Sequence, residues 1–274
     1  MLVFRYKVNV QTDTITRAIE RYTDLTFPHP STMLNGLPTL SINIADNDES
    51  HPMLHTNESY ALIIDNSSAT LSAQTIYGAL RGLETFSQLV TFDYDTETYQ
   101  ITNGPWVIRD TPRFNHRGLM IDSARHYLPV SSILSTIDSL AYAKLNVLHW
   151  HVSDEQSFPI QIKSYPLLWE ASFSRYERYT QATVAKIVEY ARDRGVRVII
   201  EFDTPGHAAS WGIGYPDIIP RPNCSTPLNV ANNKTFDVIT AVLSEMTGGK
   251  ASGPKAPSGL FPDEFIHLGG DEVS

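Results

Sequence analysis

Residues 196–207 read VRVIIEFDTPGH, an apolar run that ends in an aspartate, a proline–glycine turn and a histidine. A short run rich in β-branched residues predicts a buried strand, and the ionisable residues after it lie at its carboxyl end. The pattern recurs along the chain. A strand expected at 118–121 is followed by Asp122 and Arg125. A strand expected at 145–150 is followed by Asp154 and Glu155, and one expected at 265–268 by Asp271 and Glu272.

Helical patterns separate these expected strands. Apolar residues recur at helical spacing within 130–141, 184–191 and 236–243, and such alternation predicts a parallel sheet. The active site of a (β/α)8 barrel lies at the carboxyl ends of its strands, whereas a doubly wound sheet usually concentrates its chemistry at one switch point. Acids after four strands favour the barrel. Because a closed barrel needs eight strands, we expect 113–274 to form the first four strands of a truncated α/β barrel.

Residues 1–112 follow a different pattern. Strands are expected at 4–10, 40–44, 60–65 and 106–109, with one helix near 73–90 that begins after Ser72 as its N-cap. This pattern predicts a small α+β domain whose helix covers one face of a sheet. The turn-forming triplet Asp110-Thr111-Pro112 marks the expected boundary between the two domains.

The composition narrows the class of protein. Hydrophobic residues make up 42% of the chain and charged residues 19%, a composition typical of a globular protein. The formal net charge of −9 argues against a nucleic-acid partner. No apolar run approaches the roughly 20 residues that span a bilayer, and the opening residues carry no signal-peptide core. The single cysteine, Cys224, is consistent with a free thiol in a cytosolic protein. Together with sequons at Asn57, Asn66, Asn223 and Asn233, it instead favours a secretory protein whose signal and disulfide partner lie outside the sequence.

Asp271 and Glu272 are the strongest catalytic candidates. A solvated acidic turn is the alternative, but this pair follows an expected buried strand and the glycines Gly269 and Gly270. Adjacent residues of a strand point to opposite faces, so both acids reach one pocket only if the backbone turns, which glycine permits. A carboxylic acid that donates a proton, beside a carboxylate that stays charged, suits glycoside cleavage.

His149 and His151 raise the alternative of a metal site. Residues two apart on a strand face the same side, as metal ligands would. With Asp154, His207 and Asp271 nearby, a metal-dependent hydrolase is an alternative function. For His149 we favour a structural interpretation, a buried histidine that hydrogen-bonds between strands. We therefore expect no metal and no other cofactor.

Three further residues are candidates for ligand binding. His207 follows a proline–glycine turn at the expected catalytic face, and a rigid turn aims a side chain. Arg125 carries a donor fork suited to paired hydroxyls, with a salt bridge to Asp122 as the structural alternative. Trp211 is either a platform for sugar stacking or part of the core, and the sequence leaves both open.

Longer motifs contain these residues. They are RFNHRG at 113–118, DSARHY at 122–127, HWHVSDEQSFP at 149–159, EFDTPGH at 201–207 and HLGGDE at 267–272, together with the helix GALRGLETFSQLV at 78–90. In this order they resemble the β-N-acetylhexosaminidases of glycoside hydrolase family 20, close to the animal lysosomal type. The resemblance covers essentially the whole chain and implies a small zincin-like domain before a (β/α)8 barrel.

The resemblance also implies a reaction. Members of the family remove terminal β-linked N-acetylglucosamine or N-acetylgalactosamine with retention, and the 2-acetamido group of the substrate acts as nucleophile. Carried over to this sequence, Glu272 is the general acid and base, and Asp271 orients the acetamide. Arg125 binds sugar hydroxyls, and Asp154 and His207 complete the substrate-binding set by supporting Glu272. The family motif usually has a second aspartate where this chain has Glu155.

Partners and location follow from the same resemblance. It implies amino-sugar glycans or glycolipids as substrates, a homodimer or heterodimer, and a lysosomal or secreted location. The residues that wall the acetamide pocket in the family are expected beyond residue 274. The alternative function is therefore an inactive truncated fragment that at most binds sugar or pairs with a full-length subunit.

Overall fold

The computed structural model describes residues 4–30, 36–220, 227–249 and 259–273, so Asn223 and Cys224 lie outside the described residues. The chain forms two compact units. The first comprises Met1–His116 with Ala141–Lys144 and Asp193–Gly195, and the second comprises Arg117–Leu140, Leu145–Arg192 and Val196–Ser274. No helix among the described residues is long and apolar enough to cross a membrane.

The first unit is built on a five-stranded sheet of order β1-β2-β4-β3-β7. Its strands are β1 (Arg5–Val8), β2 (Thr39–Ile44), β3 (Tyr60–Ile64), β4 (Ala69–Ala73) and β7 (Trp106–Asp110). β1, β2 and β4 run parallel, while β3 is antiparallel to both of its neighbours. A separate hairpin pairs β5 (Thr91–Asp93) with β6 (Thr98–Gln100).

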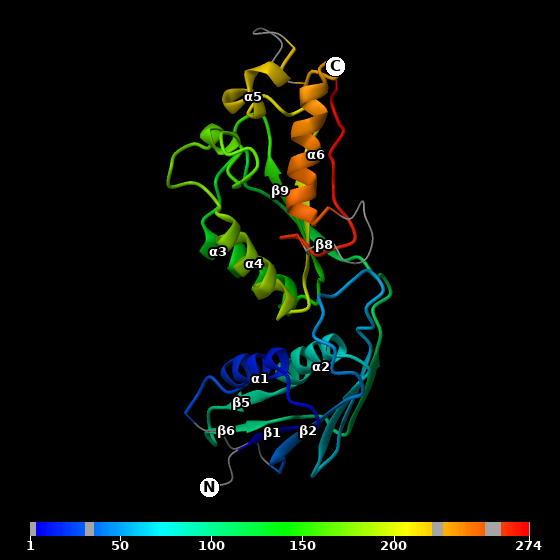
Figure 1. Cartoon of the computed structure of the whole chain (residues 1–274). Helices are drawn as coiled ribbons and strands as arrows, with labels where there is room; N and C mark the ends of the chain where they lie inside the picture. Colours follow the sequence, from blue (N-terminus) through cyan, green and yellow to red (C-terminus); the bar gives the residue numbers. More distant parts are fainter. Residues whose placement is uncertain (1–3, 31–35, 221–226, 250–258, 274) are drawn as a thin grey trace. The chain divides into compact units, whose positions relative to one another are not determined.

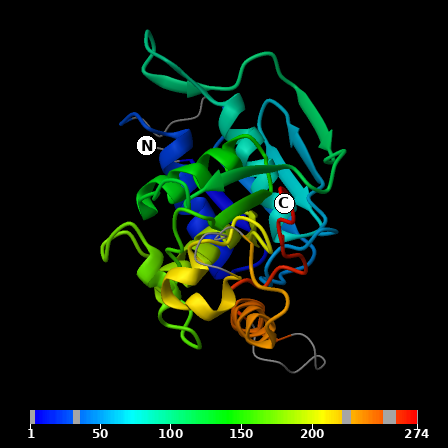
Figure 2. The same ribbon diagram turned by 90° about the horizontal axis from the view of Figure 1, so that it is seen from above.

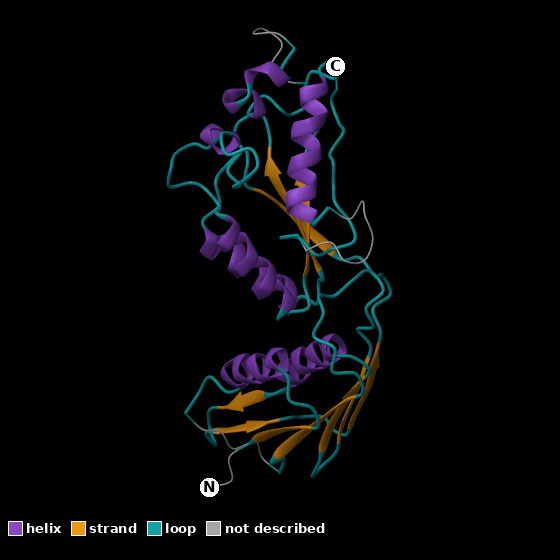
Figure 3. Cartoon of the chain, viewed as in Figure 1, coloured by secondary structure: helices purple, strands orange, loops and turns teal. Residues whose placement is uncertain are grey.

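Two helices, α1 (Asp13–Thr26) and α2 (Ile76–Leu89), cover one face of this sheet (Figures 1 and 3). A glycine lets α2 approach the sheet closely, because a β-carbon on Gly82 would lie 2.2 Å from Leu71 of β4. The prediction of α2 is confirmed, but its N-cap is Thr75 rather than Ser72. Ser72 belongs to β4, a strand that the sequence pattern did not reveal. The pattern also missed α1.

The second unit contains a parallel sheet of order β10-β9-β8. Its strands are β8 (Gly118–Asp122), β9 (Val147–Ser153) and β10 (Arg197–Phe202), and its longer helices are α3 (Val130–Tyr142), α4 (Gln181–Arg192) and α6 (Asn233–Thr247). Short helical turns lie at η1 (Leu168–Ala171), α5 (Trp211–Gly214) and η2 (Pro216–Ile218). The expected alternation of three strands and three helices is confirmed. Every residue of β10 is buried, as an apolar run in a covered parallel sheet predicts.

The expected fourth strand at 265–268 differs from the prediction. Figures 1 and 2 trace this segment as extended chain after α6, and it forms one parallel bridge to β10, between His267 and Glu201. Backbone hydrogen bonds extend this pairing on either side of the bridge. Burial was wrongly predicted: Phe265 and Leu268 are each 47% exposed, because within the described part of the chain the segment pairs along β10 alone.

Candidate active site

The expected site residues lie together at the carboxyl ends of the strands of the second unit. Arg125 follows β8, Asp154 follows β9, and His207 follows β10. Asp271 and Glu272 follow the extended segment that pairs with β10. Parallel strands end at the same edge of a sheet, which is why residues far apart in the sequence meet here.

Asp154 is the buried centre of this group. Its Oδ1 lies 3.2 Å from Nδ1 of His207, and its Oδ2 lies 2.9 Å from a terminal nitrogen of Arg125 and 2.8 Å from Nε2 of His151. Burial raises the pKa of the Asp154 carboxyl, but its hydrogen bond to His151 and the charge of Arg125 outweigh burial and lower the pKa overall. Asp154 is therefore a fixed negative charge that orients the imidazole of His207.

His207 connects Asp154 to the acidic pair. Its Nε2 lies 3.1 Å from Oε2 of Glu272 and 3.9 Å from Oδ2 of Asp271. Burial lowers the pKa of His207, whereas the hydrogen bond and charge of Asp154 and the charges of Asp203 and Asp271 raise it overall. A continuous line of hydrogen bonds therefore runs from Asp154 through His207 to Glu272.

A glycine turn brings the two acids to the same side. Gly269 and Gly270 have φ angles of +66° and +101°, values that glycine adopts without a steric penalty. A β-carbon on Gly269 would lie 1.8 Å from Oδ1 of Asp203, the same oxygen that accepts a hydrogen bond from the backbone N–H of Gly270. His207 and Glu272 also have left-handed backbones, with φ angles of +51° and +49°. The turn therefore places both carboxyl groups next to His207.

Asp203 adds a third acid beside this pair. Burial raises its pKa, and the neighbouring carboxyl of Asp271 raises it further, while the N–H of Gly270 lowers it. Two carboxyl groups that share one site do not ionise independently, because each negative charge disfavours the other. The sequence placed Asp203 at the end of a strand but gave it no role.

Arg125 has two acidic partners. One terminal nitrogen lies 2.8 Å from Oδ2 of Asp122 and the other lies 2.9 Å from Oδ2 of Asp154. The salt bridge to Asp122, the structural alternative for this residue, is thus confirmed. The Arg125 side chain as a whole is 39% exposed, so the residue lies partly at the surface of the site.

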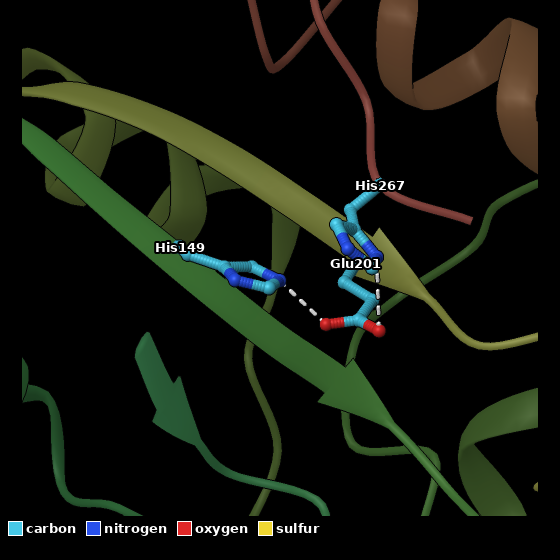
Figure 4. Close-up of side chains that lie close together, drawn as sticks. All are labelled: His149, Glu201 and His267. Carbon is cyan, nitrogen blue, oxygen red and sulfur yellow. Dashed lines mark hydrogen bonds and ion pairs between the residues drawn. The ribbon is translucent and has the colours of Figure 1, made fainter. Parts of the chain in front are cut away.

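Histidines and carboxylates come close enough for metal binding in three sets. These are His149–Glu201–His267, His151–Asp154–Asp203 and Asp203–His207–Asp271. In the first set, which Figure 4 shows, both imidazole rings point at the carboxylate of Glu201, and Nε2 of His149 hydrogen-bonds to it at 2.5 Å. The expected bond of His149 between strands is confirmed, but its side chain is 24% exposed and thus not buried as expected. Imidazole–carboxylate pairing accounts for the contacts in this set without an ion.

Glu201 was given no role by the sequence analysis, and His151 was considered there only as a metal ligand. Nδ1 of His151 lies 3.0 Å from Oε2 of Glu201, and both side chains are almost fully buried. A glutamate inside the apolar run at 196–202 is the available signal, because a buried carboxylate requires a partner, but it does not identify His151 as that partner. Trp211 is fully buried against Phe158 and Phe202, so it packs in the core and offers no platform for a sugar.

Comparisons with known proteins match both parts of the chain to related family models and proteins. Residues 114–274 match the model of the glycosyl hydrolase family 20 catalytic domain, and residues 3–89 match a model described as beta-acetyl hexosaminidase like. Beta-hexosaminidase 1 of Arabidopsis thaliana is 46% identical over 95% of this chain and 50% of its own length. The beta subunit of human beta-hexosaminidase is 44% identical over 85% of this chain and 41% of its own.

A solved structure also resembles this chain in fold. The chitobiase of Flavobacterium johnsoniae is 32% identical to this chain and superimposes with a TM-score of 0.80, over 98% of this chain and 41% of that one. The mixed α/β architecture therefore fits a glycosidase of the TIM-barrel type. The chain spans about half the length of the curated relatives it matches.

Proposed function

The chain belongs to glycoside hydrolase family 20, and we propose that it carries the acid–base half of the active site of a β-N-acetylhexosaminidase. The substrate is a terminal, non-reducing β-linked N-acetylglucosamine or N-acetylgalactosamine. The observation that carries the proposal is the line from Asp154 through His207 to Glu272, with Asp271 on the same glycine turn.

The proposed reaction retains the anomeric configuration and uses the substrate's own acetamide. The acetamido oxygen attacks the anomeric carbon while Glu272 donates its proton to the departing glycosidic oxygen, which gives an oxazolinium-like intermediate. The ionised Glu272 then takes a proton from water, and that water opens the intermediate at the anomeric carbon. Asp271 accepts a hydrogen bond from the acetamido N–H and stabilises the positive charge that develops on the acetamido group.

In this proposal the remaining site residues bind the sugar or hold Glu272 in place. Arg125, whose side chain is 39% exposed, donates hydrogen bonds to sugar hydroxyls. His207 holds Glu272 in place, and Asp154 holds His207. Asp154 is too deeply buried to meet the sugar directly, so its contribution to binding passes through Arg125 and His207.

For the architecture, we propose a zincin-like α+β domain at 1–112 and the first four strands of a (β/α)8 barrel at 113–274. The parallel order β10-β9-β8 and the pairing of His267 beside β10 support the barrel. Four further strands of the complete protein would close it and supply the walls of the acetamide pocket.

For partners and location, we propose amino-sugar glycans or glycolipids as substrates and assembly as a homodimer or heterodimer. Relatives named as subunits, such as the human beta subunit and subunit B2 of Dictyostelium discoideum, support assembly. A lysosomal or secreted location is proposed with them. Sequon residues Asn57, Asn66 and Asn233 are exposed, as glycosylation requires.

The test is hydrolysis of an aryl β-N-acetylglucosaminide by the purified chain and by the complete protein that contains it. Glu272→Gln should lower turnover by a factor of about 10²–10⁴, because it removes the proton that the leaving oxygen needs. Glu20→Gln, the same change at an exposed position of α1, is the matched control. Unchanged turnover in Glu272→Gln would contradict the assignment. Activity in the complete protein with none in the soluble chain would favour the alternative of an inactive fragment.

A further inference from the structure

The two oxygens of the Asp154 carboxylate have different partners. Oδ2 lies 2.8 Å from Nε2 of His151 and 2.9 Å from a terminal nitrogen of Arg125. Oδ1 lies 3.2 Å from Nδ1 of His207 and accepts a hydrogen bond from the backbone N–H of Glu155. Because Oδ2 is saturated by two cationic groups, Oδ1 is the oxygen left to orient His207.

His151 lies between two carboxylates. Its Nε2 bonds to Asp154, its Nδ1 lies 3.0 Å from Oε2 of Glu201, and its side chain is 4% exposed. An imidazole with an acid on each nitrogen donates from both nitrogens only when it is charged. Burial lowers the pKa of His151, but hydrogen bonds to Asp154 and Glu201 and the charges of Glu201 and Asp122 raise it to about 9.

Glu201 is held in turn by the histidines around it. Besides His151, it is bonded by Nε2 of His149 through Oε2, and Nδ1 of His267 lies 3.1 Å from Oε1. Figure 4 shows the rings of His149 and His267 pointing at this carboxylate from two different segments. Burial raises the pKa of Glu201, but the bonds to His149 and His151 lower it far below its usual range. Glu201 is therefore a permanent anion behind His151.

We propose that Glu201 and His151 are positioning residues of the site, which act through Asp154 on His207 and thereby set the proton affinity of His207. The groups form one alternating line of acids and imidazoles that runs from the interior to the acid pair: Glu201, His151, Asp154, His207 and Glu272. The proposal rests on the proposed function only where it concerns Glu272. Its effect on His207 is measurable without turnover.

The direction of the effect follows from the charges. His207 faces Asp154, Asp203, Asp271 and Glu272, which all favour its charged form. The positive charge of His151 offsets part of this field, since it neutralises Asp154 from the other side. Loss of that charge leaves Asp154 compensated by Arg125 alone, and Arg125 is shared with Asp122. His207 should then bind its proton more tightly.

The experiment is a titration of the imidazole nitrogens by nuclear magnetic resonance in the histidine-labelled chain, with His207→Asn to assign the signals. In His151→Gln and Glu201→Gln, the midpoint of His207 should rise by about half a pH unit. In Glu201→Gln, His151 loses the anion that holds its charge, and because His151 rather than Glu201 bonds directly to Asp154, this loss should outweigh the removal of the negative charge of Glu201. The matched controls are His126→Asn, which removes an exposed imidazole, and Glu20→Gln, and neither should move the midpoint.

Two results would overturn the proposal. One is a midpoint of His207 that stays fixed or falls in folded His151→Gln and Glu201→Gln. The other needs no variant: a ring of His151 that is neutral at pH 7 in the unaltered chain. This second measurement decides the matter if the variants fail to fold.

Turnover separates this proposal from the proposed function. In the complete protein, a more strongly charged His207 stabilises the Glu272 carboxylate, so the alkaline limb of kcat/KM should move to lower pH in both variants. A merely structural role would lower the rate at every pH and leave the limb in place. Failure of the proposed function appears instead as unchanged turnover in Glu272→Gln, and that outcome does not decide the result of the His207 titrations in His151→Gln and Glu201→Gln.

Discussion

Gly269 and Asp203 are in direct contact: a β-carbon on Gly269 would lie 1.8 Å from Oδ1 of the Asp203 carboxylate. The contact joins the end of β10 to the turn that presents Asp271 and Glu272. It makes position 269 unsuitable for any other residue for two separate reasons, a left-handed φ angle and a lack of space.

We predict that Gly269→Ala destabilises the chain by more than the φ angle alone requires. Gly36→Ala is the matched control, because Gly36 also has a positive φ angle, +75°, but the nearest atom to a β-carbon there is 3.4 Å away. The control should cost about 1 kcal/mol, and Gly269→Ala a further 1–3 kcal/mol from the forced displacement of Asp203. Urea unfolding measures both. Equal losses would mean that Asp203 moves aside freely.

A second prediction concerns alkaline pH. Because the folded chain raises the pKa of His151 to about 9, His151 contributes stability that is fully present below its ordinary pKa of about 6.5. This contribution is lost as the pH rises through 9, since the folded state then binds no more protons than the unfolded state. His151→Gln should therefore be less stable at pH 6 and show a flatter decline between pH 6.5 and 9. Parallel curves for the two proteins would contradict the assignment.

A third prediction concerns the ion pair between Arg197 and Asp263. Nε of Arg197 lies 2.7 Å from Oδ2 of Asp263, and the side chains are 1% and 3% exposed. Asp263→Asn leaves a buried guanidinium without its counter-charge and should lower the free energy of unfolding by about 3–5 kcal/mol. The exposed pair of Lys234 and Asp217 has nearly the same distance, 2.8 Å. Asp217→Asn should cost at most about 1 kcal/mol, because water screens that pair. Denaturant titration of both variants tests the contrast.

A fourth prediction addresses Trp211, for which the sequence left two roles open. The side chain is fully buried and packs edge-on against Phe158, with ring centroids 5.1 Å apart. Trp211→Ala should therefore cost about 3–5 kcal/mol of stability. Ile213→Ala, on the exposed side of the same short helix, should change stability by less than about 0.5 kcal/mol. A full-stability Trp211→Ala with weakened sugar binding would restore the stacking role.

The sequence predicted the second unit well because its signals are local. Strands β8 to β10 are short apolar runs followed by ionisable residues, so the strands could be located and candidate site residues could be named after them. Burial of 265–268 could not be predicted in this way, because burial depends on which segments cover a strand and not on the apolar residues within it.

The first unit was harder to predict for a physical reason. Helix α1 buries Ile15, Ala18 and Tyr22 at helical spacing, but Thr14 and Thr26 are also buried there and resemble a strand in composition. Its start is marked by Thr12, whose side chain accepts from the N–H of Ile15. A capping threonine before spaced apolar residues was therefore the available signal.

Glu201 and His151 show the limit of motif reasoning. Each stands inside a motif that was quoted for other residues, and their contact joins strands about fifty residues apart in the sequence. Pairing of this kind depends on the register of β9 against β10, which places Glu201 beside His151. The sequence does not state that register, so the pair could only be found in three dimensions.

Both partners of the hydrogen bond between His207 and Glu272 have left-handed backbones. Glycine would adopt these φ angles more readily than either residue, yet glycine has no side chain with which to make the bond. Glycine at position 207 or 272 would therefore relax the backbone only by removing the hydrogen bond. A search for thermostable variants that accepts glycine here will select for stability at the expense of chemistry, and the conflict arises from the covalent structure of the residues themselves.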